Sequence, residues 1–369
     1  MKKKILFIIW SFTFGGGAES LLTSIVNHLN PEKYEISIIE YYNAGVKEEP
    51  VNSNIHVLPP ICPCSELGRY YKTFMLYFCP QLLIKKYIKG DFDLYVAFNY
   101  LVPTFLLPKN TKNIQWIHSD VYDLLEKKEA WKWRKQNRAL DKTDKVVVIS
   151  DYTEQSVKDL FPKHENKLIK LYNGINIDSI RKKALKETAI KLKNPSIVFV
   201  GRLEDRKDPL RCINVLRLVH QYTGGGCHLY LLGEGELRNA IIEKVDKYKL
   251  SDYVHLLGYQ QNPFPIIRQC DAVCLLSKSE GFSMCLLESV ALGKPFVSTK
   301  IGGASELLNG YTCGYSIETD EEAARAICAI INTDKKHMAN ECEHSIRRFE
   351  FKSYIEKIEY LIDSVVKKD

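Results

Sequence analysis

Long hydrophobic runs are missing from this 369-residue sequence. Nowhere do 18 apolar residues follow one another without interruption, and a helix needs about that many to cross a membrane. The N-terminus begins with lysines, but its apolar stretch covers only residues 5–10 and leads into polar, glycine-rich sequence. A signal peptide needs a longer apolar core, so this stretch predicts a first β-strand.

Paired cysteines are also missing. The 11 cysteines include no C-x-x-C pair, and no histidine lies at the spacing of a tetrahedral zinc site. An odd number of scattered cysteines does not fit a disulfide framework. We therefore expect a reduced, cytoplasmic compartment in which most cysteines serve as small buried hydrophobic residues.

Charge of one sign is not in large excess. The 52 Lys and Arg against 45 Asp and Glu leave a net charge of +7, which is small for a dedicated nucleic-acid binder but favours an anionic ligand or surface. With 45% apolar and 26% charged residues, the composition is that of a globular protein and excludes wholesale disorder. The length suggests two domains, or at most three.

Short apolar runs rich in Val, Ile and Leu recur along the chain, separated by amphipathic stretches of helix length. This pattern is typical of βα units that build a parallel sheet covered on both faces. The strands predicted in the first half are 5–10, 36–40, 94–98, 114–118, 146–150 and 168–171. Those predicted in the second half are 197–200, 229–232, 254–257, 272–276 and 296–299. The fold class is therefore α/β, and each set of strands is long enough for one doubly wound, Rossmann-like domain.

A lysine-rich stretch separates the two sets of strands. Residues 179–194 carry five lysines and no predicted strand, so we interpret them as a helical or extended connector. We place the boundary between an N-terminal domain, 1–175, and a C-terminal domain, 176–348. Beyond them, apolar residues at helical spacing predict an amphipathic helix over 349–366.

Most of the positive charge lies in the first half. Residues 1–175 carry a net charge of +5 and the remainder +2. The excess gathers in 67–90 and 127–145, where Lys and Arg alternate with Tyr, Phe and Trp. Basic and aromatic residues on amphipathic segments favour docking at an anionic membrane surface. The alternative, solvated helix faces with aromatic core residues, stays open.

Two loops have a composition that suits phosphate. The first run is followed by S-F-T-F-G-G-G-A-E at 11–19, where glycines let a ligand approach the start of a helix. A plain tight turn is the alternative, because the dinucleotide fingerprint G-x-G-x-x-G has no match. The run 197–200 is followed by G-R-L-E-D-R-K, which places Arg202 and Lys207 over the crevice where doubly wound sheets bind ligands. A diphosphate suits such a pair, because Arg binds phosphate bidentately and Lys adds a compact charge.

A third cluster follows the run 272–276. It contains S-E-G-F-S-M-C-L-L-E at 279–288, then G-K-P, then G-G-A-S-E at 302–306. Residues 281–283 present backbone donors at the predicted N-terminus of a helix, where a phosphate is stabilised. Glu288 lies deeper in that helix and suits a bidentate hydrogen bond to ribose hydroxyls.

Together these motifs resemble the large retaining glycosyltransferase family called group 1 or family 4. Glu280 and Glu288 have seven residues between them, and E-G-F-S, G-K-P, G-G-x-x-E and G-R-L with Lys207 stand in the family's order. The resemblance extends to G-G-G-A-E in the first loop, to His118, to N-G-I-N at 173–176 and to L-G-E-G at 232–235. It covers nearly the whole chain.

The resemblance implies the GT-B fold: two facing Rossmann-like domains, a cleft between them, and a C-terminal helix that crosses back to the first domain, which 349–366 fits. It implies a nucleotide-diphosphate sugar, for which we expect UDP, bound mainly by the second domain, and a glycan or lipid-linked acceptor bound mainly by the first. We expect a retaining transfer in capsule, exopolysaccharide or O-antigen assembly, without a metal or another cofactor and without a nucleic-acid partner.

The resemblance also implies roles for single residues. His118 would lie near the donor sugar and the attacking hydroxyl, and Glu280 would face the hydroxyls of that sugar. Arg202 and Lys207 would hold the pyrophosphate where other transferases use a metal, and Glu288 would bind the ribose. Further donor contacts are implied for Gly16, Gly17, Gly258, Tyr259, Gly281, Phe282 and Ser283.

Two departures from the family pattern occur. Asp208-Pro209 follows Lys207 where the family commonly has glycine, and proline is well tolerated in a first helical turn that Asp208 can cap. Ser283 stands where the family often has glycine, so selectivity for the sugar is not transferable. The alternatives are a sugar-nucleotide epimerase of the same fold, which would need no acceptor, and a non-catalytic nucleotide-sugar binding module. The missing fingerprint disfavours an NAD-dependent oxidoreductase.

Overall fold

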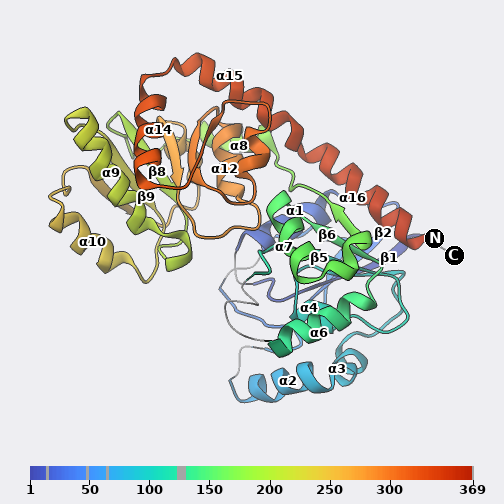
Figure 1. The fold of residues 1–369 in the computed structure, drawn as a ribbon. Coiled ribbons are helices and arrows are strands. Elements are labelled where there is room, and N and C mark those ends of the chain that lie inside the picture. Colours follow the sequence, from blue (N-terminus) through green and yellow to red (C-terminus); the bar gives the residue numbers. More distant parts are fainter. Residues whose placement is uncertain (14–15, 47–49, 64–65, 123–129, 368–369) are drawn as a thin grey trace. The chain divides into compact units, whose positions relative to one another are not determined.

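The chain divides into two compact units in a computed structural model that describes residues 1–13, 16–46, 50–63, 66–122 and 130–367 (Figure 1). Unit 1 comprises Met1–Tyr172 and the chain from Ser353 onward, and unit 2 comprises Asn173–Lys352. Outside the described residues lie Phe14 and Gly15 of the first glycine-rich loop and positions 127–129 of the second basic segment.

Unit 1 is built on a parallel sheet of seven strands in the order β3-β2-β1-β4-β5-β6-β7. The strands are β1 (Lys3–Ile9), β2 (Tyr34–Glu40), β3 (Ile55–Val57), β4 (Leu94–Ala97), β5 (Asn113–Ile117), β6 (Lys145–Val148) and β7 (Leu168–Lys170). The chain starts in the middle of the sheet, and the strand order reverses between β1 and β4. Ligands of such sheets bind outside the carboxyl ends of the strands at this point.

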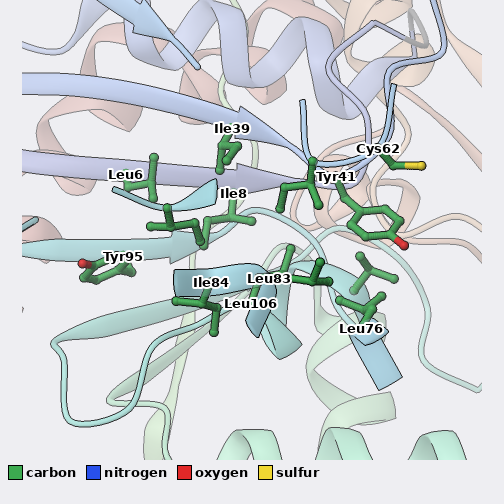
Figure 2. Packing of buried hydrophobic residues seen from close by; sticks show 13 residues of the cluster. Leu6, Ile8, Ile39, Tyr41, Cys62, Leu76, Leu83, Ile84, Tyr95 and Leu106 are labelled. Carbon is green, nitrogen blue, oxygen red and sulfur yellow. The ribbon is translucent and has the colours of Figure 1, made fainter. Parts of the chain in front are cut away.

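The sheet of unit 1 is buried on both faces. Leu6 and Ile8 of β1 point into a cluster that α2, α3 and α4 cover (Figure 2). Ile5, Phe7 and Ile9 alternate with them along the strand, are at most 1% exposed, and therefore lie on the opposite face. The helices of this unit are α1 (Gly17–His28), α2 (Glu66–Phe78), α3 (Pro80–Tyr87), α4 (Val102–Phe105), α6 (Ala130–Asp141), α7 (Asp151–Leu160) and α16 (Phe351–Val366), with a 3-10 turn η1 (Pro162–Lys167).

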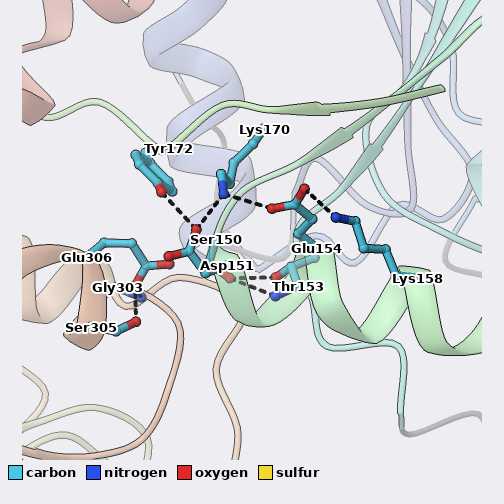
Figure 3. A network of polar contacts seen from close by, with 10 residues as sticks. All are labelled: Ser150, Asp151, Thr153, Glu154, Lys158, Lys170, Tyr172, Gly303, Ser305 and Glu306. Atoms are coloured by element: carbon cyan, nitrogen blue, oxygen red, sulfur yellow. Dashed lines mark hydrogen bonds and ion pairs between the residues drawn. The ribbon is translucent and has the colours of Figure 1, made fainter. Parts of the chain in front are cut away.

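Helix α7 shows how the sequence sets the start of a helix (Figure 3). Ser150 precedes it and its Oγ accepts a hydrogen bond of 2.9 Å from Thr153 N. Asp151 and Glu154 in the first turn each lie 2.8 Å from Lys170 of β7. A hydroxyl cap and first-turn carboxylates both stabilise the N-terminus of a helix, and here they also join it to the edge strand.

The C-terminal helix α16 belongs to unit 1 from Ser353 onward. Asp363 lies 2.7 Å from Lys3 at the start of β1 and accepts a 2.9 Å hydrogen bond from Tyr34 of β2. Glu359 lies 3.0 Å from Lys33. The apolar stripe predicted from the sequence is buried along the helix, at Tyr354, Ile355, Ile358, Leu361, Ile362 and Val365.

Unit 2 repeats the topology with six parallel strands in the order β10-β9-β8-β11-β12-β13. The strands are β8 (Ser196–Val200), β9 (His228–Leu232), β10 (Val254–Gly258), β11 (Ala272–Leu275), β12 (Phe296–Thr299) and β13 (Gly314–Ile317). Its helices are α8 (Ile177–Ala184), α9 (Pro209–Thr223), α10 (Arg238–Lys247), α11 (Phe264–Ile267), α12 (Met284–Ala291), α13 (Ala304–Leu308), α14 (Asp320–Asn332) and α15 (Lys335–Ile346), with 3-10 turns η2 (Asp205–Lys207) and η3 (Arg347–Phe349). The order reverses between β8 and β11.

The predicted α/β class with two doubly wound sheets is confirmed, and each predicted strand is present. The sequence prediction missed β3 and β13, which lie at sheet edges. Each is too short and too polar to form an apolar run, because only Ile55 of β3 and Ile317 of β13 are buried. In the ranges that the structure describes, no helix is both long and apolar enough to cross a membrane.

Candidate active site

Lys207 and Glu280 form an ion pair at the carboxyl edge of the unit 2 sheet. Lys207 follows β8 and Glu280 follows β11, the two strands between which the strand order reverses. The Glu280 carboxylate also accepts a hydrogen bond of 2.9 Å from Ser277 Oγ. Only 9% of the Glu280 side chain and 17% of the Lys207 side chain are exposed. The structure thus brings together two of the residues that the sequence assigns to one site.

Arg202 and Arg206 add positive charge to the same loop. Arg202 is more exposed than Lys207, and its Nη1 lies 3.0 Å from Glu204 Oε2. Arg206 lies 3.3 Å from Glu204 and 3.6 Å from Glu280. Three cations therefore face two carboxylates, which is complementary to an added polyanion. The sequence analysis did not assign Arg206; its place in G-R-L-E-D-R-K was the available signal.

The D-P departure leaves the start of α9 intact. Asp208 has a left-handed backbone conformation, with φ +46°, and its carboxylate accepts a hydrogen bond from Arg211 N at 3.3 Å. Pro209 occupies the first turn, where a missing N–H costs nothing. The cap therefore ends the Lys207 loop as the sequence predicts.

Glycines at the carboxyl ends of three neighbouring strands hold the Arg202 loop. Gly201 N donates to Leu232 O at 3.0 Å, and Gly233 N donates to Gly258 O at 2.9 Å. A Cβ at Gly233 would lie 1.9 Å from Gly201 O, so no other residue fits there. The motifs G-R-L and L-G-E-G therefore pack on each other. Gly258 closes this row with φ +68°, and the side chain of Tyr259 beside it is exposed.

The G-G-x-x-E motif fixes the loop that carries Glu280. Glu306 accepts hydrogen bonds from Gly303 N at 2.9 Å and from Ser305 Oγ at 2.8 Å, which caps the first turn of α13 (Figure 3). The backbone of Gly302, next to this cap, binds the Glu280 loop. Gly302 N donates to Glu280 O at 3.3 Å, and Gly302 O accepts from Ser283 N at 2.9 Å. Glu306 is therefore a positioning residue.

The sequence predicts that the backbone of Ser283 contacts the donor together with that of Gly281 and Phe282. In the structure its amide donates to Gly302 O at 2.9 Å, so this hydrogen bond holds the start of α12. The ring of Phe282 is buried and packs on Phe349, with the ring centroids 5.9 Å apart. The loop 281–283 is therefore held partly by contacts within unit 2.

Glu288 lies in the second turn of α12, which follows this loop. Burial raises the pKa of its carboxyl to about 7, although Lys183 acts in the opposite direction. The thiol of Cys285 lies within electrostatic range of both Glu288 and the ion pair. Burial raises the pKa of this thiol, and the charges of Glu288, Lys207 and Glu280 also act on it. Glu288 and the ion pair therefore lie in one electrostatic environment.

In unit 1, His118 directly follows β5. Its ring lies 4.2 Å from the ring of Phe98 and 5.8 Å from that of Trp116, between centroids. Its Nε2 atom is buried and finds no hydrogen-bond partner among the described residues. Burial lowers the pKa of the imidazole to about 3, so the ring is neutral at physiological pH. A buried polar atom without a partner costs free energy, which is tolerated where a ligand supplies the partner.

Gly16 and Gly17 lie at the N-terminus of α1, and two residues earlier in the chain, Phe12 and Thr13, are held by Glu40 at the end of β2. Glu40 Oε2 accepts from Phe12 N at 2.6 Å and from Thr13 N at 3.2 Å. A Cβ at Gly16 would lie 2.6 Å from a Glu19 carboxylate oxygen, a contact that a movement of the flexible Glu19 side chain can relieve, and the space around Gly17 is open. Rossmann folds that bind dinucleotides use an acid near the Glu40 position for ribose. Here that acid is occupied by the protein's own loop.

The two basic, aromatic segments meet on unit 1. Lys135 Nζ lies 5.3 Å, 4.9 Å and 5.8 Å from the ring centroids of Tyr77, Phe78 and Trp131. Beside it is a cavity of about 320 Å³. Among the described residues its lining includes no carboxylate and four cations, Lys109, Lys135, Arg138 and Lys142. We call this region the basic aromatic surface. Its exposed rings belong to Tyr70, Tyr71, Phe74, Phe78 and Trp131.

Glu288 predicts a pH dependence of stability. Its pKa in the fold is raised from 4.5 to about 7, so its contribution to the free energy of unfolding is lost as the pH rises toward and through 7. Glu288→Gln cannot ionise and should be more stable than the unchanged protein at pH 8, by about 1 to 3 kcal/mol, and equal to it at pH 4.5. Urea unfolding at both pH values measures this. Exposed Glu236→Gln is the control, and parallel pH profiles for Glu288→Gln and the unchanged protein would contradict the assignment.

Comparison with known proteins adds to this geometry. The family described as glycosyl transferases group 1 matches residues 180–347, and the family described as Glycosyltransferase Family 4 matches residues 15–179. The chain is 34% identical over 155 residues to the N-acetylgalactosamine-N,N'-diacetylbacillosaminyl-diphospho-undecaprenol 4-alpha-N-acetylgalactosaminyltransferase of Campylobacter jejuni. That alignment covers 41% of this chain and 40% of the relative's own length.

A longer alignment relates the chain to an Escherichia coli enzyme, UDP-Gal:alpha-D-GlcNAc-diphosphoundecaprenol alpha-1,3-galactosyltransferase. The two are 26% identical over 271 residues, which are 69% of this chain and 70% of the relative. Among solved structures, HepE of Anabaena in complex with UDP and glucose shares the fold, with a TM-score of 0.73 and 18% identity over 98% of this chain and all of that chain. The fold is GT-B, and the two family matches together extend over residues 15–347, so the chain belongs to the group 1 glycosyltransferases.

Proposed function

We propose that this chain is a retaining glycosyltransferase that moves a sugar from a UDP-sugar to a hydroxyl of a lipid-linked or other glycan acceptor. The observation that carries the proposal is the Lys207–Glu280 pair between β8 and β11, with Glu288 in the following helix. The names of the two enzyme relatives support the acceptor class, because both contain a sugar linked to undecaprenol through a diphosphate. One of these names also specifies UDP. Capsule, exopolysaccharide and O-antigen assembly are processes that use such acceptors.

Unit 2 would bind the donor. Arg202 and Lys207 would hold the diphosphate and stabilise its charge as it leaves, so that no metal ion is needed for this step. Gly281 and Phe282 would approach the donor through their backbone. Glu288 would accept hydrogen bonds from the ribose. Gly258 and Tyr259 would border the base.

Glu280 would face the hydroxyls of the donor sugar. In the unliganded arrangement its carboxylate neutralises Lys207. When a diphosphate takes over Lys207, the Glu280 carboxylate becomes available as a hydrogen-bond acceptor. We propose that this exchange of partners couples diphosphate binding to recognition of the sugar.

Unit 1 would supply the acceptor side. Gly16 and Gly17 would approach the diphosphate, and His118 would lie near the reacting carbon. The bond between the sugar C1 and the diphosphate oxygen breaks, and the diphosphate leaves with the electron pair. The acceptor oxygen bonds to C1 on the same face, and its hydroxyl proton passes to the oxygen of the departing diphosphate. The neutral His118 ring adds no positive charge that would oppose the oxocarbenium-like transition state.

Removal of either phosphate-binding cation should weaken UDP binding. Arg202→Ala and Lys207→Ala should each reduce the affinity about 10- to 100-fold, because a hydrogen bond to a charged group contributes about 1.5 to 3 kcal/mol. Isothermal titration with UDP measures this. The control is Lys278→Ala, which removes an exposed lysine of the neighbouring loop that pairs with Asp205 at 2.6 Å. Unchanged UDP affinity in both site variants would overturn the assignment.

We further propose that the basic aromatic surface contacts an anionic membrane, at the inner face of the cell membrane. Its exposed rings suit the interfacial region of a bilayer, and its cations suit anionic lipid headgroups. The location of lipid-linked acceptors in a membrane supports such a contact. This role is separate from catalysis, so it can fail without affecting the donor site.

Liposome flotation tests the membrane contact. The protein should float with anionic vesicles at low salt and not with neutral ones. The double variant Lys135→Ala/Arg138→Ala should reduce the partition coefficient by about tenfold or more, because each cation near the surface contributes about 1 kcal/mol. Lys163→Ala is the control, since Lys163 pairs with Asp141 at 2.7 Å, outside this surface. Absence of co-migration for the unchanged protein would refute the proposal.

A further inference from the structure

Trp10 stands at the carboxyl edge of the unit 1 sheet, directly after β1. Its side chain is 36% exposed, although the five residues before it, 5–9, are each at most 1% exposed. The same edge carries His118 after β5. A single exposed aromatic residue needs no explanation by itself. The residues around Trp10, however, point to a role in ligand binding.

The orientation of the Trp10 ring is fixed because it stacks on two tyrosine rings. The ring of Tyr41 lies 5.2 Å away at an interplanar angle of 23°, and that of Tyr42 lies 6.0 Å away at 29°. Tyr41 is only 1% exposed, and its hydroxyl is hydrogen-bonded to Thr73 of α2 at 3.2 Å. The orientation of the platform is therefore fixed before any ligand arrives, so little conformational entropy is lost on binding.

Asn99 follows β4, the strand between β1 and β5 in the sheet. Its Oδ1 accepts from Tyr100 N at 2.8 Å, whereas its Nδ2 has no hydrogen-bond partner within the described part of the chain. Its backbone carbonyl accepts from Gln115 at 3.0 Å. The Asn99 side chain is therefore fixed through its Oδ1, and its Nδ2 can donate to a ligand.

Two buried glutamines hold the Asn99 loop in a strained conformation. Leu101 has φ +64° and ψ −105°, which is unfavourable for a residue with a side chain. Its amide donates to Gln136 Oε1 at 2.9 Å, and Gln136 donates to Gln115 at 3.1 Å. Both glutamines are fully buried. Strain that the surrounding structure maintains in this way is concentrated at ligand sites.

The spacing of these residues fits a chain of sugars. Neighbouring strands lie about 4.8 Å apart, so the ends of β1 and β5 are separated by about 10 Å. A terminal sugar at His118 therefore leaves room for the next sugar over Trp10, with Asn99 between them. Sugar rings present C–H groups on one face and hydroxyls at the rim. The C–H face of a sugar packs well on an indole ring, and its hydroxyls accept hydrogen bonds from a carboxamide N–H.

We propose that Trp10 and Asn99 form an acceptor subsite for a saccharide of at least two units. The unit next to the terminal sugar stacks on Trp10, and Asn99 Nδ2 donates to a hydroxyl of the saccharide. This inference rests on the proposed transferase function and adds the acceptor class to it. A single sugar attached to a lipid diphosphate would not reach the platform while its hydroxyl lies at His118.

Kinetics with paired acceptors test the subsite. Mono- and disaccharides with the same short alkyl aglycone are compared at saturating UDP-sugar. Trp10→Ala should raise the KM of the disaccharide about tenfold or more and leave its kcat and the KM of the monosaccharide within about twofold. Trp10→Phe should keep most of the disaccharide affinity, and Asn99→Asp should raise the same KM severalfold. Trp131→Ala is the control, since Trp131 is similarly exposed on the basic aromatic surface.

Saturation-transfer NMR with the same disaccharides separates the two proposals, because it needs no turnover. Binding that is reduced in Trp10→Ala and kept in Trp10→Phe supports the subsite even if no sugar transfer is found, in which case only the proposed function fails. Equal disaccharide KM or binding in Trp10→Ala and the unchanged protein overturns the subsite, as does an equal effect on both acceptors. If Trp10→Ala does not fold, Asn99→Asp decides: a severalfold weaker disaccharide binding supports the subsite, and unchanged binding overturns it.

Discussion

The fold of unit 2 brings Lys207 and Glu280 together, and the proposed donor site depends on this ion pair. The two residues come from the loops after β8 and β11, so their contact exists only because the strand order reverses there. A partly buried ion pair pays a desolvation cost that its attraction barely repays, so it contributes little to stability. Because Lys207 is paired with a carboxylate and its side chain is 17% exposed, we propose that it exchanges this carboxylate for a phosphate. The account of donor binding depends on this exchange.

The glycine motifs and Glu306 are explained by the same constraint. Gly233 lets the loop after β9 approach Gly201 so closely that any side chain would collide with the backbone. Glu306 fixes the turn at Gly302 and Gly303, and that turn binds both ends of the Glu280 loop. Much of this sequence therefore acts by holding backbone in place, whereas charged groups that could meet a ligand are few.

The two units share one topology but use the acid near the first loop differently. In unit 1, the Glu40 carboxylate accepts hydrogen bonds from the amides of Phe12 and Thr13. It therefore occupies the position where the acid of a dinucleotide-binding Rossmann fold binds ribose. In unit 2, Glu288 has no such partner among the residues that the structure describes, and burial raises the pKa of its carboxyl to about 7. This difference gives a physical reason for assigning the nucleotide to unit 2 and the acceptor to unit 1.

The sequence alone predicts what depends on local pattern. Apolar runs gave the strands, and the order of the G-R-L, E-G-F-S and G-G-x-x-E motifs gave the family and assigned Lys207 and Glu280 to one site. Their ion pair became visible only in the structure. It did not predict the edge strands β3 and β13, which are short and have one buried residue each. Nor did it predict the roles of Glu40, Glu306 and Trp10 or the occupied amide of Ser283, because these depend on hydrogen bonds and ring contacts between segments distant in sequence.

The central claim is that the chain transfers a sugar from UDP with retention. The most direct measurement is the NMR assignment of the anomeric configuration of the product formed from an α-linked UDP-sugar and a saccharide acceptor, in the presence of a chelator. The account predicts a new α-glycosidic bond, formed only when the acceptor is present. A β-linked product, or conversion of the UDP-sugar to its epimer without an acceptor, would contradict it.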